Sequence, residues 1–150
     1  MARKRTKQKL PPPLREFNVW PERVDRRYYT GISPETSYYF KVKIWPSVQD
    51  FQIANSAKGV IAMCENYEKV ISYKAGTEAE IPCLGVLHFP LETLNVPRVV
   101  SHECGHAAFN WARTRKLNDL QSIHVEEDLL DVLGNLVEQV SRATQDLTKN

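Results

Sequence analysis

Apolar and polar residues follow a strand-like pattern in the first part of the chain and a helical period in its last third. Alternating aromatic and β-branched side chains predict a strand that ends at Pro46. Short apolar runs predict further strands, because fully buried strands lose the polar half of the alternation. The predicted strands span residues 38–45, 59–64, 70–73 and 82–90, and a short helix is expected over residues 47–56.

Two longer C-terminal segments have the 3.6-residue period of amphipathic helices. The first spans about residues 96–116 and has Pro97 in its opening turn, where proline is well tolerated. The second spans about residues 123–146. Strands followed by two packed helices predict an α+β domain, with a small, mostly antiparallel sheet followed by a helical hairpin. The apolar face expected on the second helix comprises Leu129, Leu130, Val132, Leu133, Leu136, Val137 and Val140.

Length and composition describe an ordinary globular protein. The 150 residues suit one domain, with 42% hydrophobic and 25% charged residues. The apolar runs are too short to span a bilayer. Three cysteines without a C-x-x-C pair argue against a disulfide framework, so we expect a reducing, cytoplasmic location. We expect Cys104 to be a packed thiol.

Charge is concentrated at the N-terminus. Residues 1–27 hold nine Lys and Arg against three acids, a net charge of +6, which leaves −4 for the rest of a chain whose net charge is +2. We expect residues 1–13 to form a basic flexible tail that ends in three prolines, and residues 14–150 to form one domain. The tail gives a weak possibility of nucleic-acid binding, and a solvated terminus is the simpler interpretation.

The strongest chemical signal is H-E-x-x-H at residues 102–106. Residues four apart share one helix face, so His102 and His106 can bind one metal ion, with Glu103 as general base. The metzincin continuation is absent, because Phe109 and Ala112 stand where glycine and histidine would be required. The competing interpretation is an amphipathic helix that carries two histidines by chance.

A catalytic zinc site needs a third protein ligand, which we expect from the second helix. Glu127 is the preferred candidate, Glu126 is the alternative, and His124 is a third possibility. Asp131, one turn after Glu127, could orient a ligand histidine. Gly134 is expected to let the two helices approach closely. These acids could instead merely complement the positive helix start.

The motif and the acids after it resemble the small gluzincin-type zinc metallopeptidase-like proteins of phages and prophages. The resemblance covers residues 84–141 and rests on residues 102–108, 126–130 and 134–137. It implies a minimal thermolysin-like, zincin-like core with one Zn²⁺ and a peptidase-type site. Glu127 and Asp131 match the Glu-x-x-x-Asp pattern of that family, whereas Glu126 replaces the asparagine that precedes the ligand there.

Zinc peptidases of this general plan pair an extended substrate with an edge strand beside the metal. As the last strand before the metal helix, residues 84–89 are our candidate for that edge. His88 on this strand could face the cleft and stabilise an oxyanion, or it could be an ordinary packed histidine.

Together these features predict a zinc-dependent hydrolase, a metallopeptidase that acts on a peptide or protein substrate in the cytoplasm, the host cytoplasm if the protein is phage-encoded. The alternative is a non-catalytic, zinc-stabilised phage protein that regulates or inhibits a host protein.

Overall fold

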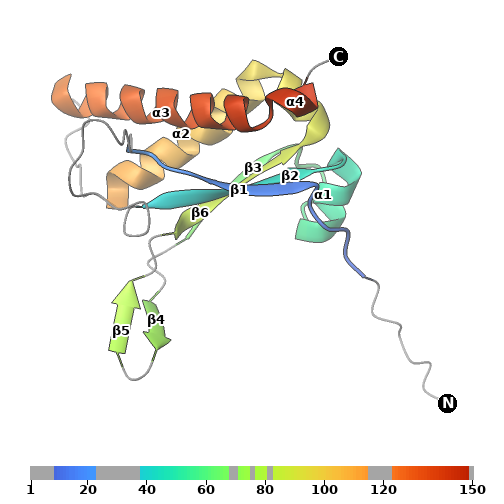
Figure 1. Cartoon of the computed structure of the whole chain (residues 1–150), viewed down its shortest axis with the longest axis horizontal. Coiled ribbons are helices and arrows are strands. Elements are labelled where there is room, and N and C mark those ends of the chain that lie inside the picture. Colours follow the sequence, from blue (N-terminus) through green and yellow to red (C-terminus); the bar gives the residue numbers. More distant parts are fainter. Residues whose placement is uncertain are drawn as a thin grey trace.

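The computed structural model describes residues 9–22, 38–67, 71–74, 77–80, 83–114 and 123–148. Four strands form one mixed sheet in the order β1-β2-β6-β3. The β1–β2 and β6–β3 pairs are antiparallel, and the central β2–β6 pair is parallel. A separate hairpin, β4–β5, projects away from this sheet (Figure 1). The strands are β1 (Arg15–Val19), β2 (Tyr39–Trp45), β3 (Met63–Asn66), β4 (Ile71–Lys74), β5 (Thr77–Glu80) and β6 (Cys83–Pro90).

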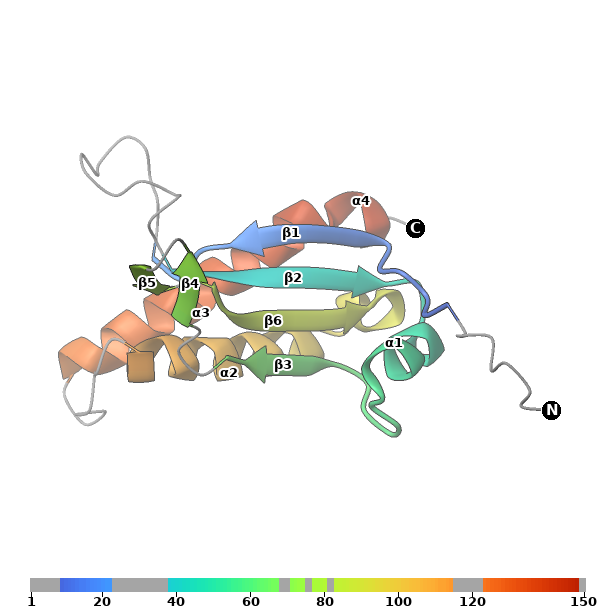
Figure 2. The same ribbon diagram turned by 90° about the horizontal axis from the view of Figure 1, so that it is seen from below.

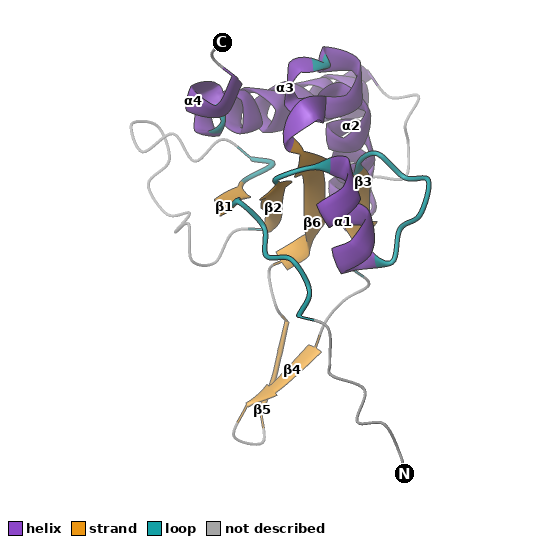
Figure 3. Cartoon of the chain, turned by 90° about the vertical axis from the view of Figure 1, so that its right-hand side faces the viewer, coloured by secondary structure: helices purple, strands orange, loops and turns teal. Residues whose placement is uncertain are grey.

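The helices divide between a two-helix layer and short connecting elements. The two long helices, α2 and α3, contact each other and run in opposite directions over one face of the sheet (Figures 1 and 2). Figure 3 shows the hairpin on the side of the sheet away from them. The α+β class is therefore confirmed. The helices are α1 (Val48–Asn55), the 3₁₀ helix η1 (Leu91–Asn95), α2 (Pro97–Thr114), α3 (Ile123–Ala143) and α4 (Gln145–Thr148).

The core lies between the sheet and the two long helices. Alternate residues of β2 and β6 point toward the helices, and these side chains are fully buried. Removing each such side chain from water stabilises the fold by about 1.5–3 kcal/mol. The core includes Phe40, Val42, Ile44, Leu87 and Phe89 from the strands, and Val100, Cys104, Ala107, Ala108, Trp111, Val132, Leu136 and Val140 from the helices.

Helix α1 matches the short helix expected from the sequence, because its ends carry good capping residues. The Ser47 hydroxyl accepts a hydrogen bond from the Asp50 amide at 3.0 Å. Glu92 of η1 accepts one from the Val48 amide at 3.2 Å, which fixes α1 to the segment before α2. Ser56 ends the helix in a left-handed conformation.

The first strand, which the sequence pattern did not predict, is fastened to the C-terminal helices. Arg15 makes two 2.7 Å hydrogen bonds to the Asp146 carboxylate and a 2.8 Å bond to the Ala143 carbonyl. The Gln139 amide group pairs with both the N–H and the carbonyl of Trp20, at 2.9 and 2.8 Å. These contacts with distant residues stabilise β1, which its local sequence pattern alone does not predict. The strand begins just after the expected tail; residues 1–8 lie outside the described residues.

The strand expected over residues 59–64 lies later, at β3, and was predicted wrongly in position. Residues 57–60 form a turn instead, closed by a 3.1 Å bond from the Val60 amide to the Ala57 carbonyl. Strand β5 was also not predicted. Residues 84–89 are not an edge, because β6 lies between β2 and β3. The edges of the four-stranded sheet are β1 and β3, and β3 is the edge that contacts α2.

Two expectations for the second helix are also wrong. Leu130 is 56% exposed, whereas Val132, Leu136 and Val140 carry the buried face. Gly134 does not serve close helix packing, since a methyl group there would meet no atom within 4 Å in the described part of the chain. The first long helix ends at Thr114, and residues 115–122 lie outside the described residues. No helix among the described residues is both long and apolar enough to cross a membrane.

Candidate metal centre

The two motif histidines lie together on the exposed face of α2. Their Nε2 atoms are 3.2 Å apart, and the rings meet edge to face at a centroid distance of 4.7 Å. With zinc–nitrogen bonds of about 2.0–2.1 Å, this separation gives an N–Zn–N angle of about 100–105°, close to tetrahedral. The separation of the two nitrogen atoms is thus compatible with one shared zinc ion, and it is equally a hydrogen-bond distance between the two rings.

Glu103 lies beside the pair but faces inward. It is 8% exposed, and among the described residues no hydrogen bond or ion pair holds its carboxylate. The position of Glu103 relative to β6 can be worked out from Asn110, whose side-chain amide donates to the Leu84 carbonyl at 3.0 Å. Glu103 is seven residues before Asn110 on α2, a distance of about 10 Å along the helix. Leu87 is three residues after Leu84 on β6, which is also about 10 Å along the strand. Glu103 is thus level with Leu87, the neighbour of Cys64 on the edge strand.

The cysteines beside this carboxylate are poor nucleophiles. Burial, and secondarily the negative charge of Glu103, raises the pKa of Cys64 to about 12. Burial likewise raises the pKa of Cys104 to about 12. Cys104 is fully buried against the sheet, as expected for a packed thiol. Burial thus disfavours the thiolate form of both cysteines.

The structure does not bring the predicted third ligand to the histidines. Glu126, Glu127 and Asp131 are exposed on α3. Within the described part of the chain, no three His, Cys, Asp or Glu side chains are arranged to hold a metal ion. The His124 side chain lies outside the described residues. Glu127 as a ligand, with Glu126 as the alternative, stays a prediction.

The axial register of the helix pair explains this separation. Ser101 of α2 lines the same cavity as Val137 and Ser141 of α3. Ser101 is therefore level with the middle of the Val137–Ser141 segment. Because the helices are antiparallel, His106, five residues after Ser101, is level with residue 134 of α3. At about 1.5 Å per residue, Glu127 lies about 10 Å farther along. Helix α2 continues for two turns beyond His106 before the chain turns back. The first residues of α3 therefore lie beside the end of α2 and not beside the histidines.

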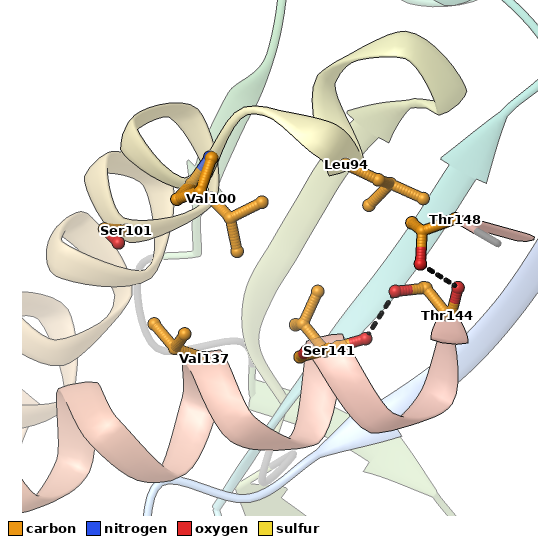
Figure 4. Close-up of a pocket in the computed structure, with 9 residues that line it drawn as sticks. Leu94, Val100, Ser101, Val137, Ser141, Thr144 and Thr148 are labelled. Carbon is orange, nitrogen blue, oxygen red and sulfur yellow. Dashed lines mark hydrogen bonds between the residues drawn. The ribbon is translucent and has the colours of Figure 1, made fainter. Parts of the chain in front are cut away.

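The cavity itself lies between the first half of α2 and the C-terminal part of α3, and Figure 4 shows the residues that line it. Its volume is about 150 Å³. The Thr144 hydroxyl inside it donates to the Val140 carbonyl at 2.7 Å, and Thr148 donates to the Thr144 carbonyl at 3.4 Å. The two threonine hydroxyls of the lining therefore have partners within the protein. The lining residues are Leu94, Pro97, Val100, Ser101, Val137, Val140, Ser141, Thr144 and Thr148.

His88 does not face the metal helix, so of the two possibilities that the sequence left open the structure has the packed histidine and not the oxyanion role. Leu87 and Phe89 point toward the helices, and strand alternation turns His88 to the opposite face. There its Nδ1 accepts a 3.1 Å hydrogen bond from the Trp45 indole, which leaves the proton on Nε2, 3.6 Å from Glu65. Burial lowers the pKa of His88, an effect partly offset by Glu65. His88 is a packed, neutral histidine.

Sequence reasoning missed Asn110, which fixes the metal helix to β6. It is 8% exposed and stands one turn after His106, on the side of α2 that faces the sheet. The available signal was a polar residue within an otherwise apolar helix face, because such a residue needs a buried partner.

Comparisons of the chain with protein-family models, with curated proteins and with solved structures found no match. The geometry of α2 is therefore the basis for any functional assignment.

Proposed function

We propose that this protein is a zinc-dependent hydrolase of the metallopeptidase type. His102 and His106 would hold Zn²⁺ and Glu103 would act as general base. The observation that carries the proposal is the 3.2 Å separation of the two Nε2 atoms, which fits tetrahedral zinc. The inward carboxylate next to this pair, without a partner among the described residues, supplies the second requirement.

Each residue of the motif has a separable task. His102 and His106 would hold the zinc ion, which would supply Lewis acidity toward the scissile carbonyl and the attacking water. Glu103 takes the proton that water loses on attack and passes it to the leaving amine. Its low exposure restricts the water around the carboxylate, which strengthens its interaction with a proton at that point.

The substrate strand in this proposal is β3 rather than β6. Figure 2 shows β3 at the edge of the sheet, and it contacts α2. Cys64 on β3 is level with Glu103, so an extended peptide that pairs with the outer edge of β3 would pass the motif. Backbone pairing of this kind recognises a peptide independently of most side chains.

The third ligand in the proposal is Glu127, with Glu126 as the alternative and Asp131 orienting a ligand histidine. Because Glu127 lies about 10 Å farther along the helix pair than His106, its carboxylate would join the two histidines of the same chain only if the start of α3 moved along the pair toward His106. Such a change would appear as zinc-dependent protection of residues 123–131 in hydrogen exchange, and its absence would exclude both glutamates.

The test is Glu103→Gln in the full chain, with peptide cleavage and zinc content measured on the same sample. The amide has the size of the carboxylate but cannot take the proton, so we expect full zinc content and loss of turnover. A Glu103→Gln protein that cleaves at the wild-type rate would refute the role of Glu103. The alternative is the non-catalytic regulator of a host protein. It replaces the hydrolase if wild type binds zinc but cleaves no peptide, and if Glu103→Gln keeps the effect of wild type on the host cell.

A further inference from the structure

The exposed faces of the two long helices, which lie on the outer side of the molecule away from the sheet, carry opposite charges (Figure 1). Helix α2 exposes Arg98 and Arg113 on either side of the motif histidines, and its single acid, Glu103, is buried. Between residues 123 and 138, α3 has five acids and neither lysine nor arginine. Two of these acids, Glu127 and Asp131, are exposed one turn apart. The exposed face of each helix is therefore complementary in charge to that of the other.

These charges are not neutralised within the part of the chain that the structure describes. The two arginines and two exposed acids named above make no ion pair with another described residue. By contrast, Glu138 of α3 pairs with Arg142 at 2.7 Å. Charges that are free in this way favour association when a surface of opposite charge approaches them.

Within one chain, Glu127 and the motif histidines are separated in two directions. Glu127 lies about 10 Å beyond His106 along the helix pair. The axes of two packed helices are also about 8–10 Å apart, so the backbones of these residues are separated by about 13 Å. A shared ion in one chain therefore requires a shift of α3 along α2. A second copy of the chain can supply the same glutamate without such a shift.

A two-fold axis gives the required arrangement. We consider two copies that face each other through the outer sides of their helix pairs. An axis midway between His106 and Glu127 then places each His106 over the Glu127 of the other copy, so that the two sites are equivalent. The step between these residues is about as long across the helix pair as along it, so the helices of the two copies cross at roughly a right angle.

Two exposed apolar side chains lie close to this axis. Phe109 is three residues after His106 on α2, and Leu130 is three residues after Glu127 on α3. Because the helices are antiparallel, each lies about 4.5 Å along its helix toward the midpoint. Phe109 is 50% exposed and Leu130 is 56% exposed. The two copies thus bring four apolar side chains together with charged residues around them, as in the apolar centre and polar rim of many protein interfaces.

We propose that two copies of this chain pair through the outer faces of α2 and α3, and that Glu127 of each copy completes the zinc site on the two motif histidines of the other. The inference rests on the zinc site of the proposed hydrolase and names the source of its third ligand. Two histidines and one glutamate leave the fourth position to water, as in catalytic zinc sites. Asp131, one turn from Glu127, comes with it to the histidines of the other copy.

The first test measures the mass of the full chain in solution, with zinc and after chelation, by analytical ultracentrifugation. One chain has a mass of 17.3 kDa. With zinc we expect twice this mass and about one zinc per chain, and after chelation the mass of one chain, because zinc links the two copies. A monomer with about one zinc per chain overturns the pairing. A dimer with about half a zinc per chain indicates four histidines on one ion, and it overturns the role of Glu127.

Mixing two defective variants distinguishes a glutamate of the other copy from one of the same chain. His106→Ala and Glu127→Ala each lack a ligand, so each alone should bind little zinc. A mixed dimer has one complete site, built from the histidines of one variant and the Glu127 of the other. An equal mixture, combined in chelator and then reconstituted with zinc, should recover about a quarter to a half of the wild-type zinc content. A mixture that recovers none overturns the inference.

The matched control for this mixture removes Glu127 from both chains. Glu127→Ala is mixed with a double variant that carries His106→Ala and Glu127→Ala, and this mixture should recover no zinc. If it recovers as much zinc as the first mixture, Glu127 is not the ligand and the inference fails.

Phe109→Ala tests the centre of the interface without removing a ligand. Each dimer loses two apolar side chains there, so the dissociation constant of the zinc-loaded dimer should rise by at least about tenfold. Ile53→Ala removes a 48% exposed side chain of α1, and as the matched control it should leave the dissociation constant unchanged. An unchanged constant in Phe109→Ala would place any dimer contact elsewhere and overturn the proposal.

Peptide cleavage, measured on the same samples, separates this inference from the hydrolase. A zinc-linked dimer whose variants recover zinc on mixing, but which cleaves no peptide, keeps the pairing and removes the hydrolase. Cleavage by a zinc-loaded monomer keeps the hydrolase and overturns the pairing. Wild-type protein that binds no zinc overturns both.

Discussion

Replacing Gly85 by alanine tests how closely the edge strand approaches β6. Gly85 has φ +157°, a conformation that side chains disfavour, at the point where the register between β2 and β6 shifts. A methyl group there would collide with the Glu65 carbonyl oxygen and lie 3.1 Å from the carbonyl carbon of that residue. The obstacle is the backbone of β3, which cannot move without disturbing its pairing with β6.

Two costs combine in this variant. The unfavourable backbone conformation costs on the order of 1–3 kcal/mol. Overpacking against a neighbouring strand costs about 1–3 kcal/mol more. We therefore expect Gly85→Ala to lower the free energy of unfolding by about 2–6 kcal/mol. The matched control is Gly134→Ala, where the methyl group meets open space and should stabilise α3 by about 0.5–1 kcal/mol.

Urea unfolding followed by tryptophan fluorescence measures both variants against wild type. A Gly85→Ala protein within about 0.5 kcal/mol of wild type, the usual range for an innocuous surface change, would refute the close approach of β3 and β6. Equal destabilisation by Gly134→Ala would show that any added methyl group is harmful, and the argument from strand contact would fail.

Two further changes test the contacts that hold the metal helix and the first strand. Asn110→Ala removes the hydrogen bond to the Leu84 carbonyl and should cost about 1–2 kcal/mol in urea unfolding; no loss would show that α2 is fixed elsewhere. Arg15 lowers the pKa of Asp146 from its ordinary value of 3.8 to about 2. This stabilisation is complete above about pH 4 and disappears as pH falls toward 2. The stability difference between wild type and Asp146→Asn should therefore close over that range, and a pH-independent difference would contradict the ion pair.

Local sequence pattern predicted the elements whose own periodicity matches their burial. Strands β2 and β6 and helices α1, α2 and α3 belong to this group. Strand β1 escaped prediction because it depends on distant partners: Arg15 on Asp146, and Trp20 on Gln139. The central place of β6 had a signal in its nearly continuous apolar run, which is typical of a strand covered on both faces. Taking it as the edge overlooked that signal.

The candidate site likewise has a part that local sequence predicts and a part that depends on distant contacts. The spacing within one helix determined that His102 and His106 meet, because helix geometry is local. The contribution of α3 was not predictable, because it depends on the length of α2 and on the connection to α3. A separation of twenty-one residues in sequence between His106 and Glu127 does not set their distance when one helix overshoots the motif by two turns.

Zinc content per chain, measured by mass spectrometry on untagged protein, tests the central claim most directly. We expect about one zinc per chain in wild type and in Glu103→Gln, and loss of zinc in His106→Ala. Parallel Glu127→Ala and Glu126→Ala samples identify which glutamate, if either, completes the site. Wild-type protein without zinc after reconstitution, or a His106→Ala protein that keeps it, would reduce the motif to two neighbouring histidines on an exposed helix face.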